Sequence, residues 1–168
     1  ATYFELLSAA AFHHFRKARV DAAIVEVGLG GRLDATNALK SPLLSVITSI
    51  GFDHKAHLGG TLRAIASEKA GILKKGVPCL CAERALEPLS EIRRRAKEVG
   101  APLREAVSRL ESIRTDWSGG GQRVVEAGGK GREFTLPLLG SAALGNAALA
   151  LDAVDILREL GLSIPADA

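Results

Sequence analysis

The arrangement of apolar and polar positions predicts four helices along the chain. They are expected over residues 3–19, 61–73, 87–99 and 141–160. Thr2 and Glu5 have the spacing of a capping box at the start of the first helix. The third helix is charged and amphipathic, and the fourth is rich in alanine and leucine.

Shorter apolar runs between these helices predict strands. Residues 22–27 form an apolar run broken by one acid, which is typical of a strand covered on both faces. Further strands are expected at residues 43–50, 77–82 and 101–107, and two more lie within residues 122–138 around a glycine-rich turn. The alternation predicts an α/β fold: a mostly parallel sheet flanked by helices, with a small antiparallel ribbon inserted before the last helix.

Composition is that of one globular domain. The chain has 168 residues, of which 47% are apolar, and its 22 basic and 19 acidic residues are interspersed. Arg93, Arg94 and Arg95 fall within a predicted helix and are interpreted as a solvated face, and aromatic residues are scarce at 4%, so no nucleic-acid partner is predicted. Cys79 and Cys81 are expected to be buried, reduced thiols. The chain shows no signal-peptide pattern or membrane-length apolar stretch, so a cytoplasmic protein without a membrane partner is expected.

Unusual polar residues follow the predicted parallel strands. Glu26 lies near the end of one strand and His54 just past the end of the next. In an open parallel sheet the ligand crevice lies beyond the carboxyl ends of the strands. A carboxylate oxygen and an imidazole nitrogen that meet there could ligate a divalent cation, although each residue alone is more often structural.

Three common nucleotide or hydrolase motifs do not fit. The glycines at residues 28–31 miss the third position of a dinucleotide fingerprint, which is occupied by Leu33. Gly128-Gly129-Lys130-Gly131 fails as a phosphate loop because Val124 occupies the leading glycine position. No Gly-x-Ser-x-Gly nucleophile elbow is present.

Four segments occur in order along the first half of the chain. They are Thr2-Tyr3-Phe4-Glu5, residues 26–37 (EVGLGGRLDATN), residues 48–54 (TSIGFDH) and residues 66–72 (ASEKAGI). Together they closely resemble the folylpolyglutamate synthase/dihydrofolate synthase family of the Mur ligase superfamily, over residue 1 to about residue 78 and more weakly beyond. The resemblance implies a P-loop NTPase-like Mur ligase central domain.

This resemblance implies an ATP-dependent ligase that joins the amine of L-glutamate to a carboxylate of folate or dihydropteroate through an acyl phosphate. Attack of a carboxylate on the ATP γ-phosphate brings two anions together, and Mg²⁺ neutralises that charge. Glu26 and His54 resemble the family's magnesium ligands. Lys69 resembles a catalytic lysine that is carbamylated in the superfamily; an ammonium cannot ligate Mg²⁺, but a carbamate can.

The resemblance also implies substrate sites. Its pterin-binding residues correspond to Thr2, Tyr3, Phe4, Glu5, Leu33, Asp34 and Ala35. An aromatic ring beside acid oxygens suits a flat heterocycle with amino donors, although Thr2 and Glu5 could also serve only as a helix cap. Asn146 resembles an asparagine near the ATP base, but Ala142, Ala143 and Leu144 replace the polar residues usual before it.

Two parts of the family pattern are not found in these 168 residues: an upstream phosphate loop and a further C-terminal ligase domain. Residues 1–168 are therefore predicted to be a partial Mur ligase central domain that is inactive by itself. A second hypothesis is a non-catalytic module that binds a pterin or self-associates through exposed strands. A third is a Mur-type peptidoglycan ligase. The residues leave open addition of the first glutamate, extension of a glutamate tail, or both.

Overall fold

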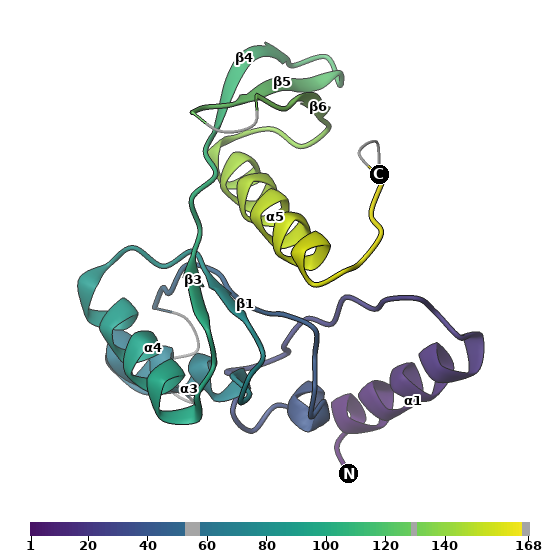
Figure 1. Ribbon diagram of the computed structural model, residues 1–168, viewed down its shortest axis with the longest axis vertical. Coiled ribbons are helices and arrows are strands. Elements are labelled where there is room, and N and C mark those ends of the chain that lie inside the picture. The colour runs from purple at the N-terminus through teal and green to yellow at the C-terminus, as the bar shows by residue number, and fades with distance from the viewer. Residues whose placement is uncertain (53–57, 129–130, 166–168) are drawn as a thin grey trace. The chain divides into compact units, whose positions relative to one another are not determined.

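A computed structural model of the chain describes residues 1–52, 58–128 and 131–165 (Figure 1). The fold contains two compact units. The first unit comprises Ala1–Cys79 and Glu83–Leu103, and the second comprises Leu80–Ala82 and Arg104–Ala168. The first unit holds most of the residues for which the sequence predicts chemistry.

Helix α1 (Tyr3–Ala18) begins with the predicted capping box. The Thr2 hydroxyl accepts a hydrogen bond from the Glu5 amide at 3.2 Å, and the Glu5 carboxylate accepts one from the Thr2 amide at 2.7 Å. These bonds satisfy two amide donors that the first turn of a helix leaves without intrahelical partners. The helix ends at Arg19, whose backbone is left-handed with φ of 53°.

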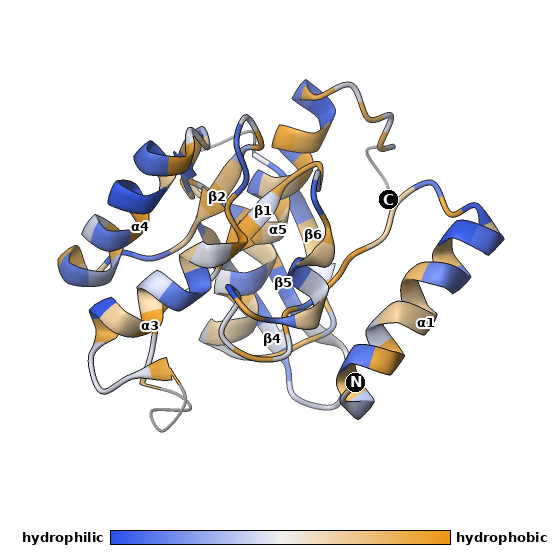
Figure 2. Cartoon of the chain, turned by 90° about the horizontal axis from the view of Figure 1, so that it is seen from below, coloured by the Kyte–Doolittle hydropathy of each residue, from blue (hydrophilic) through white to orange (hydrophobic). Residues whose placement is uncertain are grey.

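Two further helices of the first unit pack against each other through apolar faces. Helix α3 (Leu62–Lys69) is capped by the Thr61 hydroxyl and continues as the 3₁₀ helix η2 (Ala70–Ile72), close to the predicted range. Helix α4 (Leu86–Val99) ends at the left-handed Gly100. Figure 2 shows hydrophilic and hydrophobic residues alternating along α4. Its buried residues Leu89, Ile92 and Ala96 repeat at helical spacing, as the amphipathic pattern predicts.

Arg94 and Arg95 of the arginine run pair with acids of α4. Arg94 donates to both oxygens of Glu91, through Nε at 3.0 Å and Nη2 at 2.5 Å, and also pairs with Glu98. The hydrogen bonds from Arg94 hold the pKa of Glu91 at about 2, well below its ordinary value, although burial opposes them. Glu91 is therefore a structural carboxylate of the α3–α4 layer, where Arg63 also contacts it.

A parallel sheet has the strand order β1 (Ser45–Ile47), β2 (Cys79–Cys81) and β3 (Leu103–Glu105). The Ser45 amide of β1 donates to the Pro78 carbonyl at 3.0 Å, and the Cys79 amide of β2 donates to the Pro102 carbonyl at 2.8 Å. Cys79 and Cys81 are fully buried and form no disulfide. The prediction of an α/β fold with a parallel sheet and an antiparallel insertion is confirmed.

The strand predicted at residues 22–27 is wrong. These residues belong to no strand, and the Ile24 side chain is fully exposed. An apolar run becomes a strand only when a neighbouring strand satisfies its amides and carbonyls, and no strand pairs with these residues in the described part of the chain. The predicted strand at residues 43–50 is likewise shorter, since only Ser45–Ile47 forms ladder bonds.

The second unit contains an antiparallel sheet with the order β4 (Leu110–Asp116), β5 (Gly121–Glu126) and β6 (Glu133–Leu136). Helix α5 (Ser141–Glu159) packs on it through a core that includes Leu110, Val124 and Ala148. β5, β6 and α5 agree with the predicted elements, whereas β4 was not predicted. None of the helices in the described ranges has the length and apolar character needed to span a membrane.

Candidate functional site

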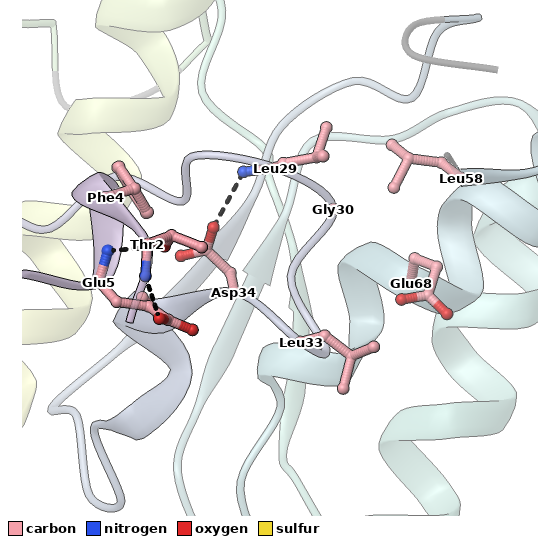
Figure 3. Close-up of a pocket in the computed structure, with 10 residues that line it drawn as sticks. Thr2, Phe4, Glu5, Leu29, Gly30, Leu33, Asp34, Leu58 and Glu68 are labelled. Atoms are coloured by element: carbon pink, nitrogen blue, oxygen red, sulfur yellow. Dashed lines mark hydrogen bonds between the residues drawn. The ribbon is translucent and has the colours of Figure 1, made fainter. Parts of the chain in front are cut away.

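One pocket of the first unit collects six of the seven residues that the family resemblance assigns to the pterin. Its volume is about 320 Å³, at the small end of the range typical of ligand sites. The start of α1, the glycine loop at residues 28–34 and the region of α3 form its walls, and we call it the α1–loop pocket (Figure 3). It is lined by Thr2, Phe4, Glu5, Leu29, Gly30, Leu33, Asp34, Ala35, Leu58 and Glu68.

Asp34 lines this pocket and stabilises the glycine loop through hydrogen bonds to its carboxylate. Its Oδ2 accepts hydrogen bonds from the amides of Gly28 at 3.1 Å and Leu29 at 2.9 Å. Its Oδ1 accepts from the Thr36 amide at 2.9 Å and from the Thr36 hydroxyl at 2.5 Å, which caps the 3₁₀ helix η1 (Ala35–Ala38). Partial burial would raise the pKa of Asp34, but the bonds from Thr36, Leu29 and Gly28 outweigh it and leave the pKa below its ordinary value.

Replacing Asp34 with asparagine is expected to destabilise the chain by about 2 kcal/mol at pH 7, because an amide NH₂ cannot accept the bonds that one carboxylate oxygen accepts. A carboxyl group whose pKa is lower in the folded than in the unfolded state stabilises the fold at pH values above its unfolded pKa, here near 3.8. This stabilisation is lost as the pH falls through the pKa of the folded state. Urea unfolding followed by circular dichroism gives the free energy of unfolding of each protein. The difference between the wild type and Asp34→Asn in this free energy should therefore become smaller below about pH 4.

The matched control for this prediction is Asp21→Asn, which changes an exposed acid of the same unit. It should leave the unfolding curve within about 0.5 kcal/mol of the wild type. If the difference in free energy of unfolding between the wild type and Asp34→Asn stayed constant down to pH 2.5, the assigned role of the carboxylate would be contradicted.

The glycine loop is fixed to the end of α3 by a second set of contacts. The Arg32 amide donates to the Glu68 carbonyl at 2.9 Å, and Arg32 Nε pairs with Glu68 Oε1 at 2.9 Å. Gly31 has a φ of 153°, and a Cβ there would come within 2.8 Å of the Glu68 carbonyl oxygen. Gly71 approaches Arg32 equally closely, since a Cβ on Gly71 would lie 2.5 Å from the Arg32 Cα. The two glycines thus allow loop and helix backbones to touch.

Asn37 fixes the far end of the loop. Its Nδ2 donates to the Arg32 carbonyl at 3.0 Å and the Gly71 carbonyl at 3.2 Å, while its Oδ1 accepts from Lys74 Nζ at 2.7 Å. The side chain therefore connects Arg32, five positions earlier, to Gly71 and Lys74, which lie 34 and 37 positions later in the sequence.

The two aromatic residues at the start of α1, Tyr3 and Phe4, lie in different environments. The Phe4 ring lies against the backbone of Gly28, where a Cβ would come within 2.5 Å of Phe4 Cζ, and Phe4 also lines the pocket. Tyr3 is 78% exposed and does not line the pocket. Of the two, Phe4 is placed to contact a flat ligand there.

The predicted metal ligands are placed only in part. Glu26 is exposed and lines a separate hollow with residues of α1. Lys69 is half-buried and is the last residue of α3. His54 lies outside the described residues, and those residues contain no cluster of three or more histidine, cysteine, aspartate or glutamate side chains suited to a metal. The magnesium site therefore stays a prediction.

Asn146 lies in the second unit, exposed in the second turn of α5. Gly140 occupies the capping position before that helix with a φ of 96°, and no side chain caps the first turn. The proposed adenine contact also stays a prediction.

Four pocket residues were not assigned from the sequence: Leu29, Gly30, Leu58 and Glu68. Leu29 and Gly30 fall inside the glycine block, and Glu68 precedes Lys69 in the ASEKAGI block. Their position inside these blocks was the only feature of the sequence that could have indicated a place in the site. Leu58 belongs to no block. Its contribution depends on the fold that brings it beside Gly30, where a Cβ would lie 2.8 Å from Leu58 Cδ2.

Comparison with known proteins decides the family, because residues 2–154 match the Mur ligase middle domain. The chain belongs to the Mur ligase middle-domain family. Its sequence is 41% identical over 160 residues to the probable dihydrofolate synthetase of Schizosaccharomyces pombe, covering 94% of this chain and 37% of that protein.

Solved structures give the same picture for this Mur ligase middle domain. An FPGS–AMPPCP–folate complex superposes with a TM-score of 0.83 at 31% identity, over 95% of this chain and 39% of that one. Mycobacterium tuberculosis folylpolyglutamate synthase complexed with ADP and AMPPCP gives 0.83 at 33% identity, over 99% and 38%. The chain spans somewhat less than two fifths of the length of these relatives.

Proposed function

We propose that the protein containing this chain is an ATP-dependent ligase that adds L-glutamate to folate or dihydropteroate through an acyl phosphate. The observation that carries the proposal is the α1–loop pocket, which gathers Phe4, Glu5 and Asp34, residues that the family resemblance assigns to the pterin. A third acid, Glu68, lines the same pocket. Relatives named for dihydrofolate and folylpolyglutamate synthesis support the same substrate class.

In this proposal the residues of the pocket hold the pterin end of the substrate. The exposed side of the Phe4 ring stacks on the heterocycle, and the leucines on the opposite wall exclude water from its other side. Carboxylates of the pocket that retain free lone pairs accept hydrogen bonds from the amino and ring N–H donors. The substrate carboxylate then projects from the pocket, where it attacks ATP, and the glutamate amine displaces phosphate from the resulting acyl phosphate.

Magnesium fits the chemistry of the proposed donors. Glu26 presents exposed carboxylate oxygens, and a carbamate on the half-buried Lys69 would add oxygen anions that suit a hard cation. When bound, Mg²⁺ would supply charge neutralisation for transfer of the γ-phosphoryl group. We assign Glu26, His54 and Lys69 to that site.

The test is a ligase assay on the product of the complete reading frame that contains this sequence. ADP release should require the pterin substrate, L-glutamate and MgATP together, and comparing dihydropteroate with tetrahydrofolate would distinguish first-glutamate addition from tail extension. The 168-residue chain alone should release no ADP, because it has no Gly-x-x-x-x-Gly-Lys-Ser/Thr sequence to cradle the phosphates. ADP release that is independent of either co-substrate would overturn the proposal.

A second candidate function is a self-associating, non-catalytic module, and the exposed apolar residues favour it. Ile24 is fully exposed in the unpaired segment at residues 22–27, and Leu6 and Leu7 of α1 are 60% and 48% exposed. Sedimentation equilibrium combined with pterin titration separates the two functions. An oligomer with no affinity for folate would support the module, whereas a folate-binding monomer would support the ligase.

A further inference from the structure

Three carboxylates line the α1–loop pocket, and they differ in the hydrogen-bonding capacity that the fold leaves to them. A carboxylate offers about four lone-pair sites. Asp34 already accepts four hydrogen bonds from its own loop. Glu5 uses one oxygen in the capping box, and Glu68 uses one oxygen in its pair with Arg32. Asp34, which the family resemblance assigns to the pterin, is therefore the acid with the least hydrogen-bonding capacity left for a ligand.

We propose that Glu68 is a specificity-determining residue of this pocket and that its Oε2 accepts a hydrogen bond from the 2-amino edge of a bound pterin. This inference rests on the proposed function. Glu68 Oε2 accepts no hydrogen bond from any residue in the described ranges, and the side chain lines the pocket. In Figure 3 Glu68 lies on the opposite side of the pocket from Thr2 and Glu5.

The backbone and side chain of Glu68 are both held in place. Its carbonyl accepts from the Arg32 amide and from the Ala70 amide that ends α3, and its Oε1 accepts from Arg32 Nε at 2.9 Å. A carboxylate fixed in this way loses little rotamer freedom when a ligand binds. A carboxylate oxygen is also a stronger hydrogen-bond acceptor than a neutral carbonyl or hydroxyl oxygen.

Glu68 is more shielded from water than the competing acid. Its side chain is 26% exposed, whereas Glu5 lies on the exposed first turn of α1. Hydrogen bonds are stronger where solvent competes less. A 2-amino-4-oxopteridine presents an exocyclic amine and an adjacent ring N–H on one edge, so Oε2 can accept one donor while Oε1 retains a lone pair for the other. A 2,4-dioxopteridine lacks that amine and should be discriminated against.

The experiment measures KM and kcat of the complete reading-frame protein for folate and for its 2-desamino-2-oxo analogue. For Glu68→Gln we expect the KM for folate to rise about tenfold or more, and the preference for folate over the analogue to fall toward one. Glu87→Gln, which changes an exposed acid of α4 in the same unit, should leave both values unchanged. Arg32→Ala keeps the carboxylate but removes its pair, and it should retain a preference for folate.

The outcomes separate this inference from the proposed function. Wild-type protein with no pterin-dependent ADP release would remove the proposed function and this inference with it. Wild-type activity with unchanged folate preference in Glu68→Gln would overturn only the role of Glu68. An equal loss toward both compounds would also overturn it, since that result indicates a structural role through the Arg32 contact. If Glu5→Gln alone abolished the preference, the specificity acid would be Glu5.

Discussion

Replacing Gly71 with alanine is expected to destabilise the first unit by about 3 kcal/mol or more. A Cβ on Gly71 would overlap the Cα and Cβ of Arg32, and these are backbone-anchored atoms that cannot move aside as a flexible side-chain tip can. Overpacking of this kind commonly costs about 1–3 kcal/mol, with larger values where the backbone must shift. The added methyl group would also push Arg32 away from Glu68 and the Gly71 carbonyl away from Asn37.

Hydrogen exchange measured by mass spectrometry can localise this effect. Amides of α3 should exchange much faster in Gly71→Ala than in the wild type, because the loop that packs on the end of α3 is displaced. Gly60→Ala is the matched control, since Gly60 is in the same unit and a Cβ there would meet no atom of the described residues within 4 Å. Normal protection of α3 in Gly71→Ala would show that the loop does not need this close approach.

Replacing Lys69 with alanine is expected to reduce ligase turnover of the complete reading-frame protein by more than a hundredfold. In the proposed function a carbamate on Lys69 supplies an anionic ligand, and alanine removes it. Substitutions of partners outside the inner ligand shell typically cost ten- to a hundredfold, so loss of an inner ligand should exceed that range. Lys69→Arg should be similarly inactive, because a guanidinium stays protonated and cannot be carbamylated.

Nuclear magnetic resonance with ¹³C-bicarbonate provides a readout beyond activity. The wild type should show a carbamate carbon signal, because carbon dioxide adds to the lysine amine to form a carbamate, and Lys69→Ala should lack it. Lys75→Ala, an exposed lysine of the same unit, should keep both the signal and the turnover. A wild-type spectrum without this signal, together with full activity of Lys69→Arg, would exclude the carbamate.

Elements with strong local signals were predictable from the sequence. The capping box at Thr2 and Glu5, the helix that starts at Thr61 and the amphipathic repeat of α4 depend on residues within one or two turns, and all three are present. Residues 22–27 and β4 show the opposite case. The first is apolar but has no strand partner in the described ranges, and the second is largely polar yet pairs with β5. Strand formation depends on a partner, which no local pattern specifies.

The same distinction applies to the candidate site. The family resemblance named residues from two distant segments, and the fold brings six of the seven into one pocket. It could not indicate that Asp34 is saturated by its own loop or that Glu68 faces the pocket, because both depend on contacts made after folding. Glu68 meets Arg32 across 36 positions of the sequence. Pairs of residues so far apart in the sequence produce no periodic pattern from which they could be predicted.

The two cysteine thiols of β2 can serve as intrinsic probes of local opening of the parallel sheet. Cys79 and Cys81 are fully buried in its middle strand, and the sequence contains no other cysteine. An alkylating reagent reaches them only in the brief intervals when neighbouring strands separate. The rate of their modification thus reports how often the sheet opens, without any engineered label.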